Sequence, residues 1–293
     1  MTVLFECSYQ NERYFGFGLP EDGAPLRLYP LLDADLRAAV VAAAGDGAAL
    51  EAALTRGRQQ TVVPAAERDA VALRPPLLPE SLGDAMVSGF MQTHNVKVDE
   101  NTQAQPNWFL KGLGDVLKLS GEELTVPAGA IAVCEEAEVV LVYVTDEHGT
   151  AHYAGHSFGN DVTDIGRFRN HNGHLSYAKL CDAGVAPWLF VGPPPRSVTG
   201  QVAIERDGAR AWEGKFTTGA DAMHYDVDAI MAELLSHRPL LYPGRVHYVY
   251  IGADRSSFHD GYRIESGDRV EITFASHGVT LSHTVRWQGG TAK

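Results

Sequence analysis

A strongly apolar stretch, residues 130–145, carries three acidic residues just before its most apolar part, and this feature most constrains what the chain can fold into. Its valines, leucine and tyrosine are typical of a buried β-strand. Because side chains alternate between the two faces of a strand, Glu136 and Glu138 should point to the same side. Two carboxylates held this close repel each other unless a cation lies between them. The segment therefore predicts either a metal site or an acidic strand end in water, and it leaves both open.

A second predicted strand, residues 153–161, also ends in acidic residues, with Asp161 at its end and Asp164 shortly after it. The interval between the two strands suits a hairpin or a neighbouring pair, which would bring Asp161 beside the two glutamates. A helix cap or a turn is the alternative role for either aspartate. Carboxylate oxygens are hard ligands, so a metal site here would favour Mg²⁺, with Mn²⁺ or Ca²⁺ as alternatives.

Composition excludes several classes of partner. The formal net charge of -13 over 293 residues disfavours binding to nucleic acid, whose backbone is itself negative. The sequence has no apolar run long enough for a membrane helix, and its beginning does not resemble a signal peptide. The three cysteines are scattered and form no CxxC pair, which suits a reducing compartment. We therefore expect a cytoplasmic protein that binds neither nucleic acid nor membranes.

Two domains are expected, residues 1–75 and residues 76–293. Prolines are concentrated between Gln59 and Glu80, and such a stretch is typical of a connector. The boundary near residue 75 is placed inside this stretch. The first domain is therefore small and the second is large.

Local patterns predict a β-rich protein of the α+β class. Residues 1–30 are expected to form short strands, and the alanine-rich segment from Asp33 to about Arg56 two helices broken at residues 45–47. After residue 85 most segments are short runs rich in Val, Ile, Phe and Tyr, bounded by Gly, Pro or Asp. One helix is predicted over residues 226–239, where apolar residues recur on one face. No glycine-rich nucleotide loop follows any predicted strand.

The order of five segments resembles the fumarylacetoacetate hydrolase superfamily over roughly residues 80–287. The matching motifs are an E-x-E on a strand, an N-D-V-T after a glycine-rich strand, a K-x-x-D, an L-x-P-G and a final G-D-x-V-E-I. In this sequence they are residues 136–138, 160–163, 179–182, 241–244 and 267–272.

This resemblance implies a mixed β-sheet roll with a small N-terminal α/β domain, a Mg²⁺ site and a homodimer. Glu136, Glu138 and Asp161 match the metal ligands. Lys179 matches a catalytic lysine that stabilises an enolate or the substrate carboxylate. Lys111 and Asp182 fall where members of the superfamily contact substrate, although an exposed lysine at a strand end is an equal alternative for Lys111.

The chain departs from the superfamily where hydrolytic members carry N-Y-x-x-H-x-x-E, whose histidine and glutamate activate water. In residues 88–100, His94 is one position out of register and Lys97 stands in the place of the acid. His94 is still the candidate general acid or base, with Asp99 or Glu100 as its orienting partner. The alternative for His94 is a polar residue on a mobile loop.

The layout looks like that of the sugar-acid dehydratases of the superfamily. It implies a Mg²⁺-dependent lyase that dehydrates a 2-keto-3-deoxy sugar acid, a small 2-oxo acid, through a metal-stabilised enolate. The first alternative is a C–C bond hydrolase of an acylpyruvate or fumarylacetoacetate-type diketo acid. The second is a non-catalytic relative that binds 2-oxo acids. Dehydration is preferred because it needs no activated water, and the water-activating pair is irregular here.

Overall fold

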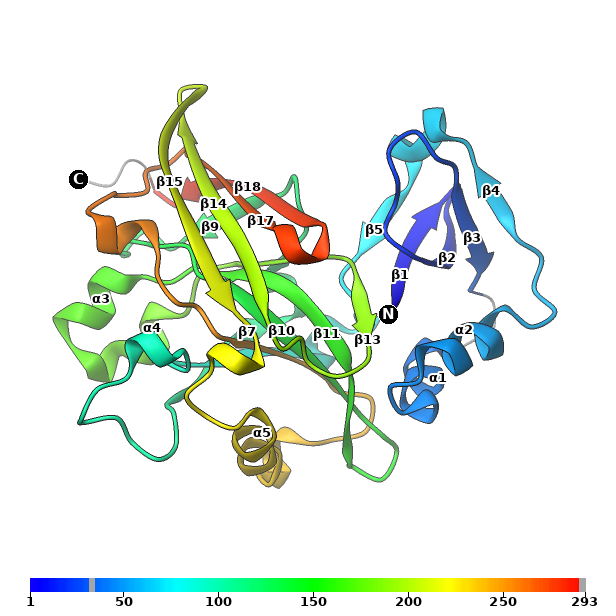
Figure 1. Cartoon of the computed structure of the whole chain (residues 1–293), viewed down its shortest axis with the longest axis horizontal. Helices are drawn as coiled ribbons and strands as arrows, with labels where there is room; N and C mark the ends of the chain where they lie inside the picture. Colours follow the sequence, from blue (N-terminus) through cyan, green and yellow to red (C-terminus); the bar gives the residue numbers. More distant parts are fainter. Residues whose placement is uncertain (32–34, 290–293) are drawn as a thin grey trace.

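The computed structural model describes residues 1–31 and 35–289. Its N-terminal part is a lobe of short strands with two helices beside it (Figure 1). The strands are β1 (Thr2–Tyr9), β2 (Glu12–Phe17), β3 (Leu26–Pro30), β4 (Thr61–Val63) and β5 (Ala72–Arg74). The helices are α1 (Leu36–Ala43) and α2 (Gly47–Thr55).

The two predicted helices of the alanine-rich segment are confirmed, as is the break between them. Each begins at an aspartate whose side chain accepts hydrogen bonds from backbone N–H groups of the first turn, Asp35 for α1 and Asp46 for α2. Asp33, where the predicted segment starts, lies outside the described residues.

In the rest of the described chain strands outnumber helices, as the sequence predicts. The strands are β6 (Ala85–Phe90), β7 (Trp108–Leu113), β8 (Leu117–Lys118), β9 (Glu123–Val126), β10 (Ala137–Thr145), β11 (Ala151–Asp161), β12 (Ala183–Val185), β13 (Leu189–Val191), β14 (Val198–Arg206), β15 (Ala209–Thr218), β16 (Val246–Ile251), β17 (Arg269–Phe274) and β18 (Val279–Trp287). The helices are α3 (Ile165–Asn170), α4 (Leu175–Ala178) and α5 (Val227–Leu235). The last lies within the predicted range and is capped by Asp226.

These strands form two mixed sheets. The larger runs in the order β4-β3-β2-β1-β13-β11-β10-β16-β6-β7, and the smaller in the order β15-β14-β17-β18-β9. Most pairs are antiparallel, but β16 pairs with β6, β18 with β9, and β12 with β8, in parallel. The aromatic rings of Phe158 on β11 and Phe274 on β17 lie 4.7 Å apart in the core between the sheets. The predicted β-rich α+β class with mixed sheets is therefore confirmed.

The larger sheet continues from the N-terminal lobe into the rest of the chain. Strand β1 pairs with β13, and Leu4 lies opposite Leu189 in the register. Strand β5 ends at Arg74, close to the proposed boundary, and β6 begins at Ala85. The division at residue 75 stays a prediction, because one sheet joins the two parts. None of the helices in the described chain has both the length and the apolar character needed to cross a bilayer.

His156 is a fully buried histidine on β11, where it packs inside the core. Its ring stacks on Phe190 with 5.3 Å between centroids and meets Phe158 edge-on. Its Nε2 has no hydrogen-bond partner among the described residues. Burial lowers the pKa of His156 to about 3. The imidazole is therefore neutral in the folded protein.

We expect this histidine to make the fold acid-sensitive. Between pH 6.5 and 3 the unfolded chain binds a proton at His156 that the folded chain does not. The free energy of unfolding should therefore fall by about 1.4 kcal/mol per pH unit of acidification from this group alone. Urea denaturation from pH 7 to 4 should show a shallower slope in His156→Leu. The exposed His171→Leu serves as the control and should keep the wild-type slope; equal slopes in all three proteins would contradict the prediction.

Candidate metal centre

The pairing of β10 with β11 brings the predicted ligands to one end of the larger sheet. The strands are antiparallel, with Glu138 opposite Gly159 and Ala137 opposite Asn160. Just beyond, the Asp161 N–H donates to the Glu136 carbonyl oxygen at 2.9 Å. The Asn160 side chain accepts from the Glu136 N–H at 3.1 Å. The interval between the strands therefore places Asp161 beside the two glutamates, as the sequence argument required.

The three carboxylates form one buried cluster. Glu136, Glu138 and Asp161 each offer an oxygen, and these oxygens all lie within 4.8 Å of one another. The residues are only 6%, 4% and 0% exposed. The alternative of an acidic strand end in water is therefore wrong. Buried carboxylates of this density need cations beside them.

Two buried lysines supply part of the compensating charge. The Lys179 Nζ lies 2.7 Å from Glu136 Oε2 and 2.5 Å from Asp161 Oδ2, and it donates to Thr163 Oγ1 at 2.7 Å. The Lys111 Nζ lies 2.7 Å from Asp161 Oδ1 and donates to the Val162 carbonyl at 2.6 Å. Lys111 is 1% exposed, so the alternative of a solvent-exposed lysine is wrong.

A third lysine, Lys97, reaches the cluster from the loop after β6. Its Nζ lies 3.3 Å from Glu136 Oε1, and its side chain is 17% exposed. It ends a short 3-10 helix, Asn95–Lys97. The sequence comparison marked Lys97 only as the residue in place of an acid. Its contact with Glu136 depends on how the loop folds back, for which the sequence carries no periodic signal.

Glu136 and Glu138 differ in how far the lysines offset the effect of burial on their pKa values. Burial alone would raise the pKa of Glu136, but the ammonium groups of Lys179 and Lys97 outweigh it and hold that pKa below its usual range. Burial, followed by the negative charges of Asp161 and Glu136, raises the pKa of Glu138 well above its usual value. Glu138 is therefore the carboxylate whose charge is least compensated.

The donor atoms fit a divalent cation with a preference for oxygen. Among the described residues, Glu138 Oε2 and Asp161 Oδ1 are buried without a hydrogen-bond donor. The 2.7 Å approach of Lys111 to Asp161 is an ion pair and lacks hydrogen-bond geometry. Buried polar atoms usually have a hydrogen-bond partner, so two buried oxygens without a donor in one cluster fit the ligand set of a cation. Mg²⁺, Mn²⁺ and Ca²⁺ suit such ligands.

His94 and Asp182 lie apart from these contacts. His94 is 3% exposed, so the alternative of a residue on a mobile loop is wrong. Its Nδ1 accepts from the Val96 N–H at 3.2 Å, and burial lowers the pKa of His94. Asp182 accepts from the Thr125 N–H at 2.8 Å and so holds β9. The catalytic role of His94 and the substrate contact of Asp182 stay predictions.

The orienting partners expected for His94 are absent from the described structure. Of the hydrogen bonds and ion pairs between described residues, none joins His94 to Asp99 or Glu100. Asp99 instead accepts from the Asn101 N–H at 2.9 Å within its own loop. The described residues therefore do not bring His94 together with either carboxylate, and the orienting partner of His94 stays a prediction.

His259 is a histidine near the cluster for which no sequence pattern indicated a role. It lies in the 3-10 helix Ser257–Asp260, and its Nδ1 accepts from the Ser256 N–H at 3.2 Å. Partial burial, followed by the charge of Lys97, lowers the pKa of His259, and the charge of Glu136 opposes this. The ring is therefore within electrostatic reach of both residues.

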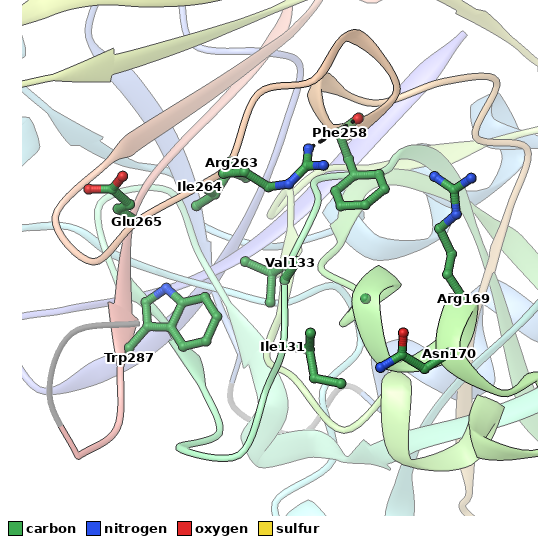
Figure 2. Close-up of a pocket in the computed structure, with 11 residues that line it drawn as sticks. Ile131, Val133, Arg169, Asn170, Phe258, Arg263, Ile264, Glu265 and Trp287 are labelled. Carbon is green, nitrogen blue, oxygen red and sulfur yellow. Dashed lines mark hydrogen bonds between the residues drawn. The ribbon is translucent and has the colours of Figure 1, made fainter. Parts of the chain in front are cut away.

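A cavity of about 530 Å³ lies beside the segment that leads into the cluster. Its lining includes Val133 and Phe258 (Figure 2). The guanidinium carbons of Arg263 and Arg169 lie 4.0 and 5.5 Å from the centre of the Phe258 ring. Neighbouring Arg167 instead pairs with Asp164 at 3.2 Å. The lining of the cavity therefore combines apolar side chains with two arginines and one glutamate, Glu265.

The β-rich α+β fold, with two glutamates, an aspartate and a lysine buried at a strand end, agrees with the fold that the motif resemblance implied. No protein-family model and no curated protein matches the sequence. Solved structures of the same fold do match, and their similarity extends over the whole chain.

One is 2-keto-3-deoxy-D-arabinonate dehydratase complexed with magnesium and 2,5-dioxopentanoate, at 17% identity and a TM-score of 0.63, covering 98% of this chain and 99% of that one. Another is 2-hydroxyhepta-2,4-diene-1,7-dioate isomerase from Mycobacterium marinum, at 19% identity and 0.63, covering 99% and 100%. A third is 5-carboxymethyl-2-hydroxymuconate delta-isomerase from Mycobacterium smegmatis, at 18% and 0.62, covering 98% and 100%. At these sequence identities the similarity shows the fold alone. The resemblance indicated by the motifs is therefore confirmed for the fold.

Proposed function

We propose that this protein is a divalent-metal-dependent lyase that dehydrates a 2-keto-3-deoxy sugar acid. The observation that carries the proposal is the buried cluster of Glu136, Glu138 and Asp161, which Lys179 contacts and in which two oxygens lack a hydrogen-bond donor among the described residues. One protein of the same fold is a dehydratase complexed with magnesium and 2,5-dioxopentanoate. That compound is what remains when a 2-keto-3-deoxy pentonate loses water.

In this reaction a proton leaves C3 and the C4 hydroxyl leaves as water after gaining a proton. C5 then loses a proton and C3 regains one, and the C4=C5 enol so formed takes a proton at C4 to give the aldehyde of the dioxo acid. A divalent cation held by the three carboxylates would supply Lewis acidity for the keto and carboxylate oxygens of the substrate. Lys179 adds a fixed positive charge beside it. Burial would lower the pKa of Lys179, but Asp161 and Glu136 raise it, so the ammonium stays charged. Preorganised charge of this kind favours the negative charge that develops when C3 loses its proton.

Dehydration is preferred to C–C hydrolysis because of how the loop after β6 is arranged. Hydrolysis of a diketo acid needs a water activated by a paired histidine and carboxylate. In the described structure His94 makes its hydrogen bond with the Val96 N–H, and Lys97 pairs with Glu136. Both features argue against a water-activating pair. Formation of the enolate, which dehydration and hydrolysis have in common, does not depend on such a pair.

The deciding experiment incubates purified protein and Mg²⁺ with 2-keto-3-deoxy pentonates and hexonates, and separately with acylpyruvates. We expect a dioxo acid product from at least one sugar acid, and no product after chelation of the metal. Mass spectrometry with pyruvate detection distinguishes the outcomes. Pyruvate release from acylpyruvates alone would replace the lyase by the hydrolase, and metal binding without turnover would favour the non-catalytic relative.

A homodimer and a cytoplasmic location belong to the same proposal. The dimer rests on the resemblance, and the location on the cysteine pattern and on the composition. Light scattering coupled to size-exclusion chromatography tests the dimer. A mass of one chain, 31.7 kDa, would contradict it.

A further inference from the structure

The three lysines at the carboxylate cluster differ in how firmly they are held. Lys111 and Lys179 have side chains 0% and 1% exposed. Each also donates a hydrogen bond outside the carboxylates, Lys111 to the Val162 carbonyl and Lys179 to Thr163 Oγ1. Lys97 has a side chain 17% exposed, and among the described residues its Nζ has one polar contact, Glu136 Oε1 at 3.3 Å. Of the three ammonium groups, that of Lys97 therefore needs the least free energy to move away from the carboxylates.

The loop that carries Lys97 is fastened on both sides of it. Before it, the Thr93 carbonyl accepts from the His224 N–H at 2.9 Å, and Thr93 Oγ1 accepts from the Gly252 N–H at 3.0 Å. After it, the Gln103 carbonyl accepts from the Tyr225 hydroxyl at 2.9 Å. A long lysine side chain can change rotamer while such a backbone stays in place. Movement of Lys97 therefore does not require the loop to open.

Formal charges explain why a third lysine is useful. The three carboxylates and three ammonium groups cancel, and a divalent cation would leave two positive charges. A 2-oxo acid enters with one negative charge, and its enolate carries two. The net charge of the metal-loaded site therefore balances the charge of the enolate only when Lys97 is included. An active site complementary to the charge that develops during reaction accelerates that reaction.

We propose that Lys97 is a substrate-binding residue that pairs with Glu136 when the metal is absent and with the carboxylate of the 2-oxo acid once a divalent cation has taken its place. The ammonium and the metal compete for the same carboxylate, so binding of the cation frees Lys97. The freed ammonium lies at the partly exposed side of the cluster, from which a substrate must enter. This inference rests on the proposed function for its substrate class.

The test uses Lys97→Met with two ligands that undergo no reaction, Mn²⁺ and oxalate. Removing the competing ammonium should tighten Mn²⁺ binding several-fold, measured by electron paramagnetic resonance. The same change should weaken oxalate binding to the Mn²⁺-loaded protein by about 10-fold or more, because a charge-assisted hydrogen bond is lost. Titration calorimetry reports the second value. Effects of opposite sign are not expected from a residue that only supports the fold.

Two further variants act as controls. Lys97→Arg keeps the charge and should retain most of the oxalate affinity. Lys215→Met removes one positive charge from an exposed position on β15, and it should leave both affinities unchanged. Unchanged oxalate affinity in Lys97→Met, or equal losses in Lys97→Met and Lys215→Met, would overturn the role of Lys97. Absence of sugar-acid turnover in a wild-type protein that binds oxalate through Lys97 would overturn the proposed lyase alone.

Discussion

Replacing Glu138 by glutamine should abolish divalent-metal binding and activity while leaving the fold as stable as before, or more stable. The side chain keeps its shape and can still accept from the Ala253 N–H, now 3.3 Å from Glu138 Oε1. It loses the negative charge, which burial and the charges of Asp161 and Glu136 already disfavour. Repulsion within the metal-free cluster is therefore relieved. A divalent metal ion bound at the cluster, by contrast, would lose one of its ligands.

We expect Mn²⁺ affinity to fall at least about 100-fold, the upper end of the loss caused by removing an outer-shell partner. Activity should fall with it, and the midpoint of thermal unfolding without metal should stay the same or rise. Calorimetric titration and thermal melts measure both. Loss of metal binding together with a large fall in the unfolding midpoint would show that Glu138 acts mainly in folding.

Glu135→Gln is the matched control for this experiment. Glu135 is also buried and lies on the same segment, but its carboxylate accepts from the Ser257 N–H at 2.7 Å and from Ser257 Oγ at 2.6 Å. It is thus turned away from the cluster. Metal binding should survive this substitution. Equal loss of Mn²⁺ affinity in both variants would contradict the assignment of Glu138 as a ligand.

The cluster could be predicted because it depends on local regularities. Alternation along extended backbone places Glu138 of β10 and Glu136, just before that strand, on one face, and a short connection makes β11 the neighbour of β10. Asp161 then follows from the register of two adjacent strands. The motif order adds Lys179, which is distant in sequence and which strand periodicity could not have placed. Local pattern and motif order together account for these four residues.

The remaining residues depend on irregular structure, which has no period to read. Lys97 reaches Glu136 because a 3-10 turn and a tethered loop aim it there, and His259 nears the same group from another such turn. His94 was chosen for its type and approximate position, but its ring accepts from its own loop. The positions of site residues on loops are therefore the part of the site that could not be predicted from the sequence.

Replacing Lys179 by methionine should lower the free energy of unfolding by about 3–5 kcal/mol, the usual cost of removing one partner from a buried ion pair. It leaves Glu136 Oε2 and Asp161 Oδ2, now 2.7 and 2.5 Å from the ammonium, facing an apolar side chain. Activity should also fall by about 10²–10³-fold, because a preorganised charge is lost. Urea denaturation and steady-state kinetics give the two values.

A double-mutant cycle with Asp161→Asn separates the ion pair from general damage to the core. If the loss arises from an uncompensated carboxylate, Asp161→Asn in the Lys179→Met background should recover part of the stability, with a coupling energy of about 1–3 kcal/mol. Mn²⁺ should also raise the unfolding midpoint more in Lys179→Met than in the wild type, because the cation compensates charge that the ammonium no longer does. Additive losses in the cycle would mean that Lys179 stabilises the fold through packing, with its charge reserved for the reaction.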